Sequence, residues 1–389
     1  MTLSCLADVT LSGHVRSYYT QDAVPDAEVR VTGTGICVIT NEDGYFVLKV
    51  AEMPQRLTVS ALGHRNKVVS TLEENCADLD LWLLPETRLL NQVTVYTPAD
   101  LVRMAIDKIP ENYGRTSERL SCFYRETTRK QSRYVNLSEA VMSLYKTDYN
   151  HGIFRDQVQV EKGRSLISQR AKDTLSIKVI GGPHEAVQLD LVKNREILLY
   201  EEDIAAYRFT MEEGTSIDER AQYVISFEPE RERPYALYRG KLYIDMELLA
   251  FTRMEISLDM KDTQKATSVM LYKKPFGLRF RPRELSTIIS YHYDGTCFRL
   301  SYLRNLYYFS CDWKKRWFST AYRVVSEMVV TDYQEAEVPR SRKGAFGSHD
   351  MLDTQTEAFN DAAFWESYNI LEPSESLEHA VKRLKRRAE

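Results

Sequence analysis

Short runs of alternating apolar and polar positions dominate the N-terminal part of the chain, and such alternation is typical of half-buried β-strands. In the first run the apolar positions are Val9, Leu11, Gly13 and Val15. Similar runs follow at residues 28–32, 36–40, 45–50, 56–61, 66–70 and 79–83, with a closing segment at 92–96. The pair Asp43-Gly44 supplies the positive φ that a tight hairpin needs. This pattern predicts a seven-stranded β-sandwich of the immunoglobulin or transthyretin kind over residues 8–96.

A helix is predicted directly after the sandwich. Thr97 is a good N-cap, Pro98 suits the first helical position, and Asp100 favours the positive end of the helix dipole. Apolar residues then recur on one face as far as Pro110, which cannot continue a helical hydrogen-bond ladder. We therefore expect a linking helix within residues 97–114 that packs on one of the domains it joins.

From Leu120 onward the strand patterns return and are longer. They cover residues 243–250 (two strands and a turn), 251–259, 267–273, 284–293, 296–303 and 323–330. Such a succession predicts a larger antiparallel domain over residues 115–334, a curved sheet or half-barrel with one concave face and a few helices. Residues 335–389 are expected to form a loop and then an amphipathic helix at 375–387. The predicted fold class is mainly β.

Composition narrows the setting of the protein. The net charge is −4, so no basic field favours nucleic acid as a partner. No apolar run reaches the roughly 20 residues that span a bilayer, so no transmembrane segment is predicted. Cys5-Leu6-Ala7 resembles the end of a secretory signal whose charged and apolar parts are missing. We expect a periplasmic or outer-membrane-associated protein whose signal peptide is absent from this chain.

Motifs that carry chemistry are scarce. The cysteines and histidines are scattered, without the spacing of a zinc or redox site, and no nucleophile elbow occurs. The sequence therefore predicts no catalytic residue, no metal ligand and no cofactor. Cys297 and Cys311 flank what the pattern suggests is one hairpin. A disulfide and two separate buried thiols are both open there, and separate thiols are favoured.

Two groups of residues are candidates for a ligand or partner surface. Asp190, Lys193 and Asn194 follow an apolar stretch, and the favoured alternative for them is turn hydrogen bonding with a surface salt bridge. The second group mixes aromatic and basic side chains, which suits a glycan or an anionic lipid. Its members are Trp313, Lys314, Lys315 and Trp317. The alternative for this group is a hairpin with inward rings and basic side chains that reach solvent.

Four motifs in the sandwich carry a specific resemblance. They are Gly13-x-Val15, Pro25-x-Ala27-x-Val29-x-Val31-x-Gly33-Thr34, Thr40-Asn41-Glu42-Asp43-Gly44-Tyr45-Phe46 and Leu57-x-Val59-Ser60-Ala61-Leu62-Gly63-His64. These motifs resemble the carboxypeptidase-regulatory-like domain, a transthyretin-like sandwich common at the N-termini of Bacteroidetes envelope proteins. The resemblance implies an accessory module without a zinc ion or a nucleophile.

Further motifs lie in the second half of the chain. Among them are Gly181-Gly182-Pro183, Leu189-Asp190-x-Val192-Lys193-Asn194, Gly240-x-Leu242-Tyr243-Ile244-Asp245 and Cys311-Asp312-Trp313-Lys314-Lys315. They resemble a family of uncharacterised Bacteroidetes proteins that pair the sandwich with a C-terminal β-domain, and this family implies no established activity. The turn that begins at Gly240 also resembles a turn in the half-barrel of periplasmic lipoprotein carriers. This analogy rests on that one turn.

Three functions are open at this point. The first is a non-catalytic envelope protein that binds a partner protein, or an apolar or lipid-like ligand, through the concave face of its β-domain. The second is a hydrolase of an unrecognised type with a cleft around His184 and Asp190. The third is a structural assembly adaptor whose sandwich docks another envelope component. The absence of catalytic spacing favours the first.

Overall fold

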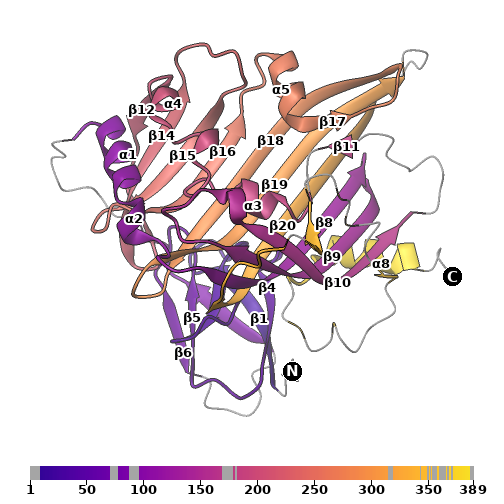
Figure 1. Ribbon diagram of the computed structural model, residues 1–389. Coiled ribbons are helices and arrows are strands. Elements are labelled where there is room, and N and C mark those ends of the chain that lie inside the picture. The colour runs from indigo at the N-terminus through magenta and orange to yellow at the C-terminus, as the bar shows by residue number, and fades with distance from the viewer. Residues whose placement is uncertain are drawn as a thin grey trace.

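A small sandwich and a large curved sheet account for most of the structure (Figure 1). The computed structural model describes residues 9–70, 78–86, 96–168, 178–179, 182–313, 319–341, 343–347, 350, 352, 357–358, 365, 368 and 371–385. Strands predominate among these residues, which confirms the predicted mainly β fold class.

The sandwich contains the seven strands that the N-terminal alternation predicts. They are β1 Val9–Ser17, β2 Glu28–Val31, β3 Cys37–Ile39, β4 Tyr45–Val50, β5 Arg56–Ser60, β6 Lys67–Ser70 and β7 Leu79–Leu83. One sheet has the order β4-β1-β7 and the other has the order β3-β2-β5-β6. Leu11, Val15 and Phe46 alternate with more exposed neighbours and are fully buried in the sandwich core. The predicted closing segment at 92–96 lies outside the described residues, apart from residue 96.

Two helices follow the sandwich, α1 at Pro98–Asp107 and α2 at Ile109–Asn112. Thr97 and Asp100 form a capping box, in which each side chain accepts a hydrogen bond from the backbone N–H of the other residue. Pro110 does not end the helical region but lies in the first turn of α2, where its missing N–H leaves no hydrogen bond unmade. The apolar face of α1 is buried in the same core as the inner face of the large sheet.

Among the described residues, the large sheet has thirteen strands and its two edges do not pair with each other. Its members are β8 Glu118–Lys130, β9 Arg133–Lys146, β10 Gln157–Ile167, β12 Tyr207–Met211, β13 Thr215–Ile217, β14 Arg220–Pro229, β15 Tyr238–Asp245, β16 Phe251–Leu258, β18 Leu278–Tyr293, β19 Phe298–Trp313, β20 Thr320–Glu335, β21 Ala345–Phe346 and β22 Glu357–Ala358. The order is β12-β14-β15-β16-β18-β19-β20-β8-β9-β10-β21, with β13 beside β14 and β22 beside β10. Only the pair of β10 and β22 is parallel among the described strands of this sheet, and β20 pairs with β8 to join the last long strand to the first.

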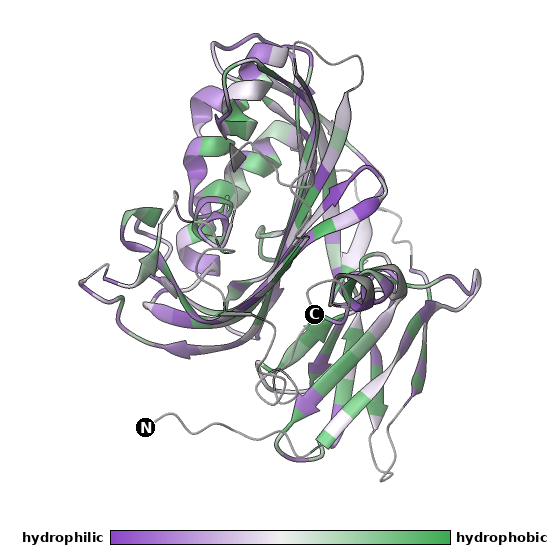
Figure 2. Ribbon diagram, turned by 90° about the vertical axis from the view of Figure 1, so that its right-hand side faces the viewer, coloured by the Kyte–Doolittle hydropathy of each residue, from purple (hydrophilic) through white to green (hydrophobic). Residues whose placement is uncertain are grey.

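The sheet is curved, and different parts of the chain cover its two faces (Figure 2). Helices lie on the inner, concave side, among them α3 at Glu185–Gln188, α4 at Glu201–Ile204 and α5 at Thr263–Met270. The sandwich and helix α8 at Glu375–Lys385 lie on the outer side. Because both faces are covered, all the side chains of β9 from residue 137 to 144 are buried. Within the described ranges, no helix is long and apolar enough to cross a membrane.

Polar and apolar contacts attach the sandwich to the outer face of the sheet. Ile39 of β3 is buried in one cluster with Tyr302 of β19. The Tyr302 hydroxyl also donates a hydrogen bond to Asp26 Oδ1 at 3.1 Å. His292 of β18 lies 3.5 Å from the carboxylate of Glu28 in β2. The two β-structures therefore share a buried interface as well as the linking helices.

Only part of the predicted strand at 267–273 is a strand. Residues 267–270 belong to α5, whose N-terminus is capped by the side chain of Asp262. Ala266 and Met270 on one face of this helix are buried against the sheet. The cap and this burial outweigh the strand preference of the β-branched residues in the segment. The remaining short elements are η1 Ile153–Arg155, η3 Arg195–Ile197 and the paired strands β11 Lys178–Val179 and β17 Leu271–Lys273.

The two cysteines considered for a disulfide are separate buried thiols. Cys297 directly precedes β19, and Cys311 lies near the far end of the same strand. At a rise of about 3.3 Å per residue, the extended strand separates them by roughly 45 Å. A disulfide needs Cα atoms closer than about 7 Å. The pattern had suggested a hairpin between them, and the length of β19 is what rules the pairing out.

Gly240 of β15 provides a test of the close packing between β15 and β16 in the large sheet. A Cβ atom at this position would lie 1.9 Å from the backbone oxygen of Glu255 on the neighbouring strand β16. Gly240→Ala should therefore lower the free energy of unfolding in urea by about 1–3 kcal/mol, the usual cost of overpacking. Gly152→Ala is the matched control, because nothing lies within 4 Å of its added Cβ. Equal stability of the two variants would contradict the close approach.

Candidate functional site

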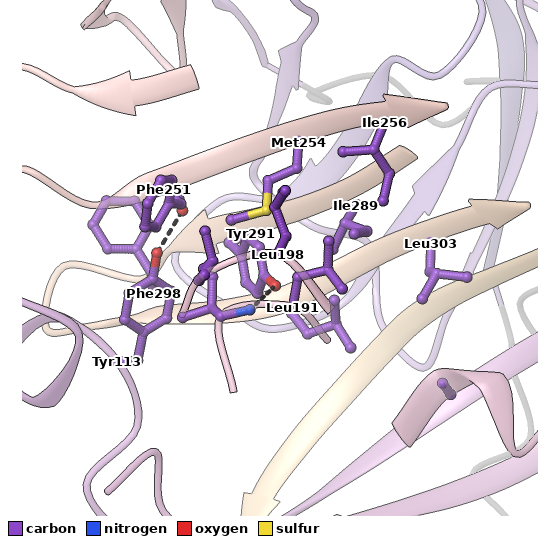
Figure 3. Close-up of a cluster of buried hydrophobic side chains, with 14 of the residues drawn as sticks. Tyr113, Leu191, Leu198, Phe251, Met254, Ile256, Ile289, Tyr291, Phe298 and Leu303 are labelled. Carbon is purple, nitrogen blue, oxygen red and sulfur yellow. Dashed lines mark hydrogen bonds between the residues drawn. The ribbon is translucent and has the colours of Figure 1, made fainter. Parts of the chain in front are cut away.

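The segment between residues 182 and 204 lies on the inner face of the large sheet as a series of short helical turns. Leu191 and Leu198 of this covering segment are buried in one cluster with Met254, Ile289 and Leu303 of the sheet (Figure 3). The strands contribute to this cluster from alternate positions, because successive residues of a strand face opposite sides. The covering segment leaves a cavity beside the cluster.

The cavity has a volume of about 410 Å³. The covering segment contributes His184, Glu185, Gln188, Leu189 and Ile197 to its wall. The opposite wall consists of Val269 from α5 and of Tyr238, Leu285, Thr287, Asn305 and Tyr307 from the sheet. Most of the exposed surface of the cavity is apolar, and the polar groups come from His184, Glu185, Gln188, Thr287 and Asn305. Such a wall suits a ligand with an apolar body and one polar end.

Glu185 is an acidic side chain in the cavity wall and is only 6% exposed. Its Oε1 accepts hydrogen bonds from the hydroxyl of Tyr307 and from Nδ2 of Asn305, the latter at 3.0 Å. Its Oε2 accepts one from the hydroxyl of Ser326 at 3.3 Å. Burial raises the pKa of Glu185 to about 7, although these hydrogen bonds favour the carboxylate. The cavity therefore holds a carboxyl group that can donate or accept a hydrogen bond near neutral pH.

Asp190 is fully buried and forms an ion pair with Lys146 at the end of β9. Its two oxygens also accept hydrogen bonds from the hydroxyls of Tyr149 and Tyr291, each at 2.8 Å. Burial acts to raise the pKa of Asp190, but Lys146 and the two hydroxyls outweigh it, so that the pKa lies below its ordinary value. This carboxylate therefore ties the covering segment to β9 and β18.

Lys193 forms a second buried ion pair, with Oδ2 of Asp156 at 2.8 Å. Burial, and after it the charge of Lys146, lowers the pKa of Lys193 to about 8 despite the attraction of Asp156. Asn194 donates a hydrogen bond from Nδ2 to the carbonyl of Gln188 at 2.7 Å, which closes the turn after α3. The covering segment is thus held by two ion pairs and by a hydrogen bond within itself.

Asp190, Lys193 and Asn194 do lie together, but they are buried and form no exposed ligand or partner surface. The reason is that other elements of the fold supply partners for both charges. Two opposite charges can leave water together when hydrogen bonds satisfy their remaining atoms. The expected surface salt bridge is also wrong, because the ion pairs of Asp190 and Lys193 are both buried.

The second predicted group lies largely outside the described residues. Lys314, Lys315 and Trp317 are not described, and of Trp313 only the backbone at the end of β19 is. The glycan or lipid surface proposed for this group stays a prediction.

The sequence predicted a ligand site on the concave face, but of the residues in the cavity wall it named only His184. Glu185 and Tyr307, which meet in its wall, are 122 residues apart in the chain. The only available signal was the strand alternation that places Asn305 and Tyr307 on one face. His184 of the hydrolase hypothesis lines the cavity, whereas Asp190 is not among the described residues of the wall. These two residues therefore do not face one common cleft.

By fold and site, the protein is a mainly β protein in which an open curved sheet carries a largely apolar cavity on its inner face. Residues 11–95 match the family model of the CarboxypepD_reg-like domain, so the N-terminal sandwich is a domain of this kind. No curated protein matches the chain.

Two solved structures show a distant likeness. One is a domain described as an outer membrane lipoprotein-sorting protein from Vibrio parahaemolyticus, 8% identical, with a TM-score of 0.27, covering 63% of this chain and 97% of its own. The other is a DUF1329 family protein from Desulfovibrio piger, 9% identical, with a TM-score of 0.26, covering 64% of this chain and 95% of its own. At such TM-scores neither structure carries an argument about this protein.

The raised pKa of Glu185 has a consequence for stability. As pH rises from about 4.5 to about 7, the unfolded chain releases this proton first, so the folded state loses stability over this range. The total loss is on the order of 3 kcal/mol. Glu185→Gln should remove this part of the pH dependence in urea unfolding, whereas the exposed control Glu196→Gln should keep it. Parallel pH profiles for wild type and Glu185→Gln would contradict the buried carboxyl group.

The ion pair between Lys146 and Asp190 can be broken by Asp190→Asn. This change leaves the Lys146 charge buried without its counter-charge, and we expect a loss of about 3–5 kcal/mol in the free energy of unfolding. Glu228→Gln is the control, because it breaks an exposed ion pair with Arg208 and should change stability little. Similar unfolding curves for the two variants would show that the internal pair contributes no more than a surface one.

Proposed function

We propose that the protein is a non-catalytic cell-envelope protein that binds an apolar, lipid-like ligand on the inner face of its large sheet. The observation that carries this proposal is the cavity of about 410 Å³ with a mostly apolar wall and one buried carboxyl group. Pockets for small ligands usually have volumes of about 300–1,000 Å³, with few polar groups that set the orientation of the ligand.

The cavity wall has an apolar part and a polar part, which suit the two ends of such a ligand. Leu189, Ile197, Val269 and Leu285 offer an apolar surface for an acyl chain or a similar hydrocarbon body. The polar end of the ligand would lie at Glu185, which accepts a hydrogen bond as a carboxylate and donates one when protonated. Because the pKa of Glu185 is about 7, binding should depend on pH near neutrality.

The assignment to the cell envelope rests on the sandwich. Its motifs resemble a module common in envelope proteins, and residues 11–95 match the family model of that domain. In this proposal the sandwich is the part that contacts an envelope partner, and the large sheet is the part that holds the ligand.

The arrangement of polar groups supports binding rather than hydrolysis. Both oxygens of Asp190 accept hydrogen bonds inside the protein, from Lys146, Tyr149 and Tyr291, so this carboxylate is not free to take a proton from a substrate. The hydrolase hypothesis placed Asp190 in a cleft with His184, and the internal hydrogen bonds of Asp190 argue against that role.

Native mass spectrometry with lipid extraction on protein purified from its own cells tests the proposal. We expect a co-purified lipid or acyl compound with the wild type. Val269→Trp fills the cavity from α5 and should remove this compound and weaken the binding of a fluorescent fatty acid at least tenfold. Val68→Trp is the control, since Val68 is 57% exposed on the sandwich. A wild type that is empty and does not bind the fatty acid would refute the proposal.

A further inference from the structure

The outer face of the large sheet carries a row of charges in which each charge faces its opposite. The residues paired across β19, β20, β8, β9 and β10 are Arg304, Glu327, Arg125, Glu139 and Arg164. Arg125 donates to Glu139 from Nε at 2.7 Å, and Arg164 donates to the other oxygen of the same carboxylate at 2.6 Å. Charges of alternating sign on neighbouring strands stabilise one another, and we call these five residues the matched row.

A second row on the same face contains two arginines and, across β19, β20, β8 and β9, no acid. Arg323 of β20 lies directly opposite Arg129 of β8, with Tyr308 and Tyr134 as the outer neighbours. The guanidinium carbon of Arg129 lies 4.9 Å from the centre of the Tyr134 ring, and that of Arg323 lies 5.4 Å from the centre of the Tyr308 ring. No carboxylate in the described part of the chain forms an ion pair with either arginine. Two like charges in direct opposition destabilise a strand pair.

A hollow of about 100 Å³ lies beside this arginine pair. Its wall combines the outer face of the sheet with Asn41 of the sandwich and Leu377 of α8. Nε of Arg129 is buried and has no hydrogen-bond acceptor among the residues that the structure describes. A buried N–H group usually has an acceptor, so this donor points to one that lies outside the residues the structure describes.

Carboxylates also line the hollow, but none of them neutralises the arginine pair. Glu327 is a member of the matched row, and Glu42 lies 3.6 Å from Arg304 of the same row. Glu372, in the segment before α8, is half-buried and forms no ion pair with Arg129 or Arg323, neither of which pairs with a described carboxylate. The excess positive charge in the hollow therefore belongs to the second row.

We propose that this hollow binds a phosphate or phosphomonoester group between Arg129 and Arg323. A guanidinium group presents parallel N–H donors that match two oxygens of a phosphate. A tetrahedral dianion offers oxygens to both arginines at once and matches their two charges, whereas a single carboxylate brings only one negative charge. The tyrosine rings hold both guanidinium groups in place before the anion arrives, which lowers the entropic cost of binding. This site is on the opposite face of the sheet from the cavity and does not depend on its ligand.

Titration of the full-length protein with inorganic phosphate, followed by calorimetry at low ionic strength, tests the site. Arg129→Gln and Arg323→Gln each remove one guanidinium group and should weaken phosphate binding about tenfold or more. Arg129→Lys keeps the charge but loses the paired donors, and its affinity should lie between these values. Arg208→Gln removes the same charge from the edge strand β12 and should leave the affinity unchanged. Melting curves in phosphate-free buffer establish that each variant is folded.

Vesicles of phosphatidylcholine with and without phosphatidic acid distinguish the sources of the phosphate group. Binding of free phosphate identifies a soluble ligand, and binding of phosphatidic acid vesicles alone identifies a lipid head group. Either result supports the proposal if binding is lost in both glutamine variants and kept in Arg208→Gln. Equal binding by the wild type and the two variants overturns it, as does a wild type that binds neither phosphate nor these vesicles.

Discussion

The buried ion pair between Lys146 and Asp190 is the interaction on which the inner face of the protein depends. It lies where β9 ends and where the covering segment turns after α3, and Tyr291 of β18 hydrogen-bonds to the same carboxylate. Hydrophobic contacts alone would allow a short helical segment to shift along the sheet, because they have no preferred direction. A buried charge tolerates no such shift, because leaving it unpaired costs several kcal/mol. The ion pair thus holds the covering segment in place directly after α3, the helix that carries Glu185.

The properties of the cavity follow from this placement. Glu185 is brought against Tyr307 and Asn305 on the inner face, where hydrogen bonds stabilise its carboxylate but burial still raises its pKa. The result is a mostly apolar space with one group that titrates near neutral pH. Such a combination is suited to selecting ligands by their polar end while the remainder of the ligand is held by apolar contact.

Different interactions dominate on the two faces of the large sheet. The inner face is apolar and receives the helices, so its contacts are mainly those of a hydrophobic core. The outer face carries ordered rows of charge, which the sandwich and α8 only partly cover. Matched charges such as Arg125 and Glu139 neutralise each other there, while Arg129 and Arg323 face one another. One sheet therefore carries a largely apolar cavity on its inner face and an arginine pair on its outer face.

Local pattern was enough to determine the seven strands of the sandwich, its Asp43-Gly44 turn and the helix capped by Thr97, because alternation, turns and caps depend on residues close in sequence. It also determined that Asp190, Lys193 and Asn194 form one polar cluster. Tertiary structure alone decided that this cluster is internal, since the hydroxyl of Tyr291 comes from a strand 101 residues away. The cavity also depends on tertiary structure. Its wall consists of segments that are far apart in the sequence and that only the folded sheet brings together, so no local pattern predicts it.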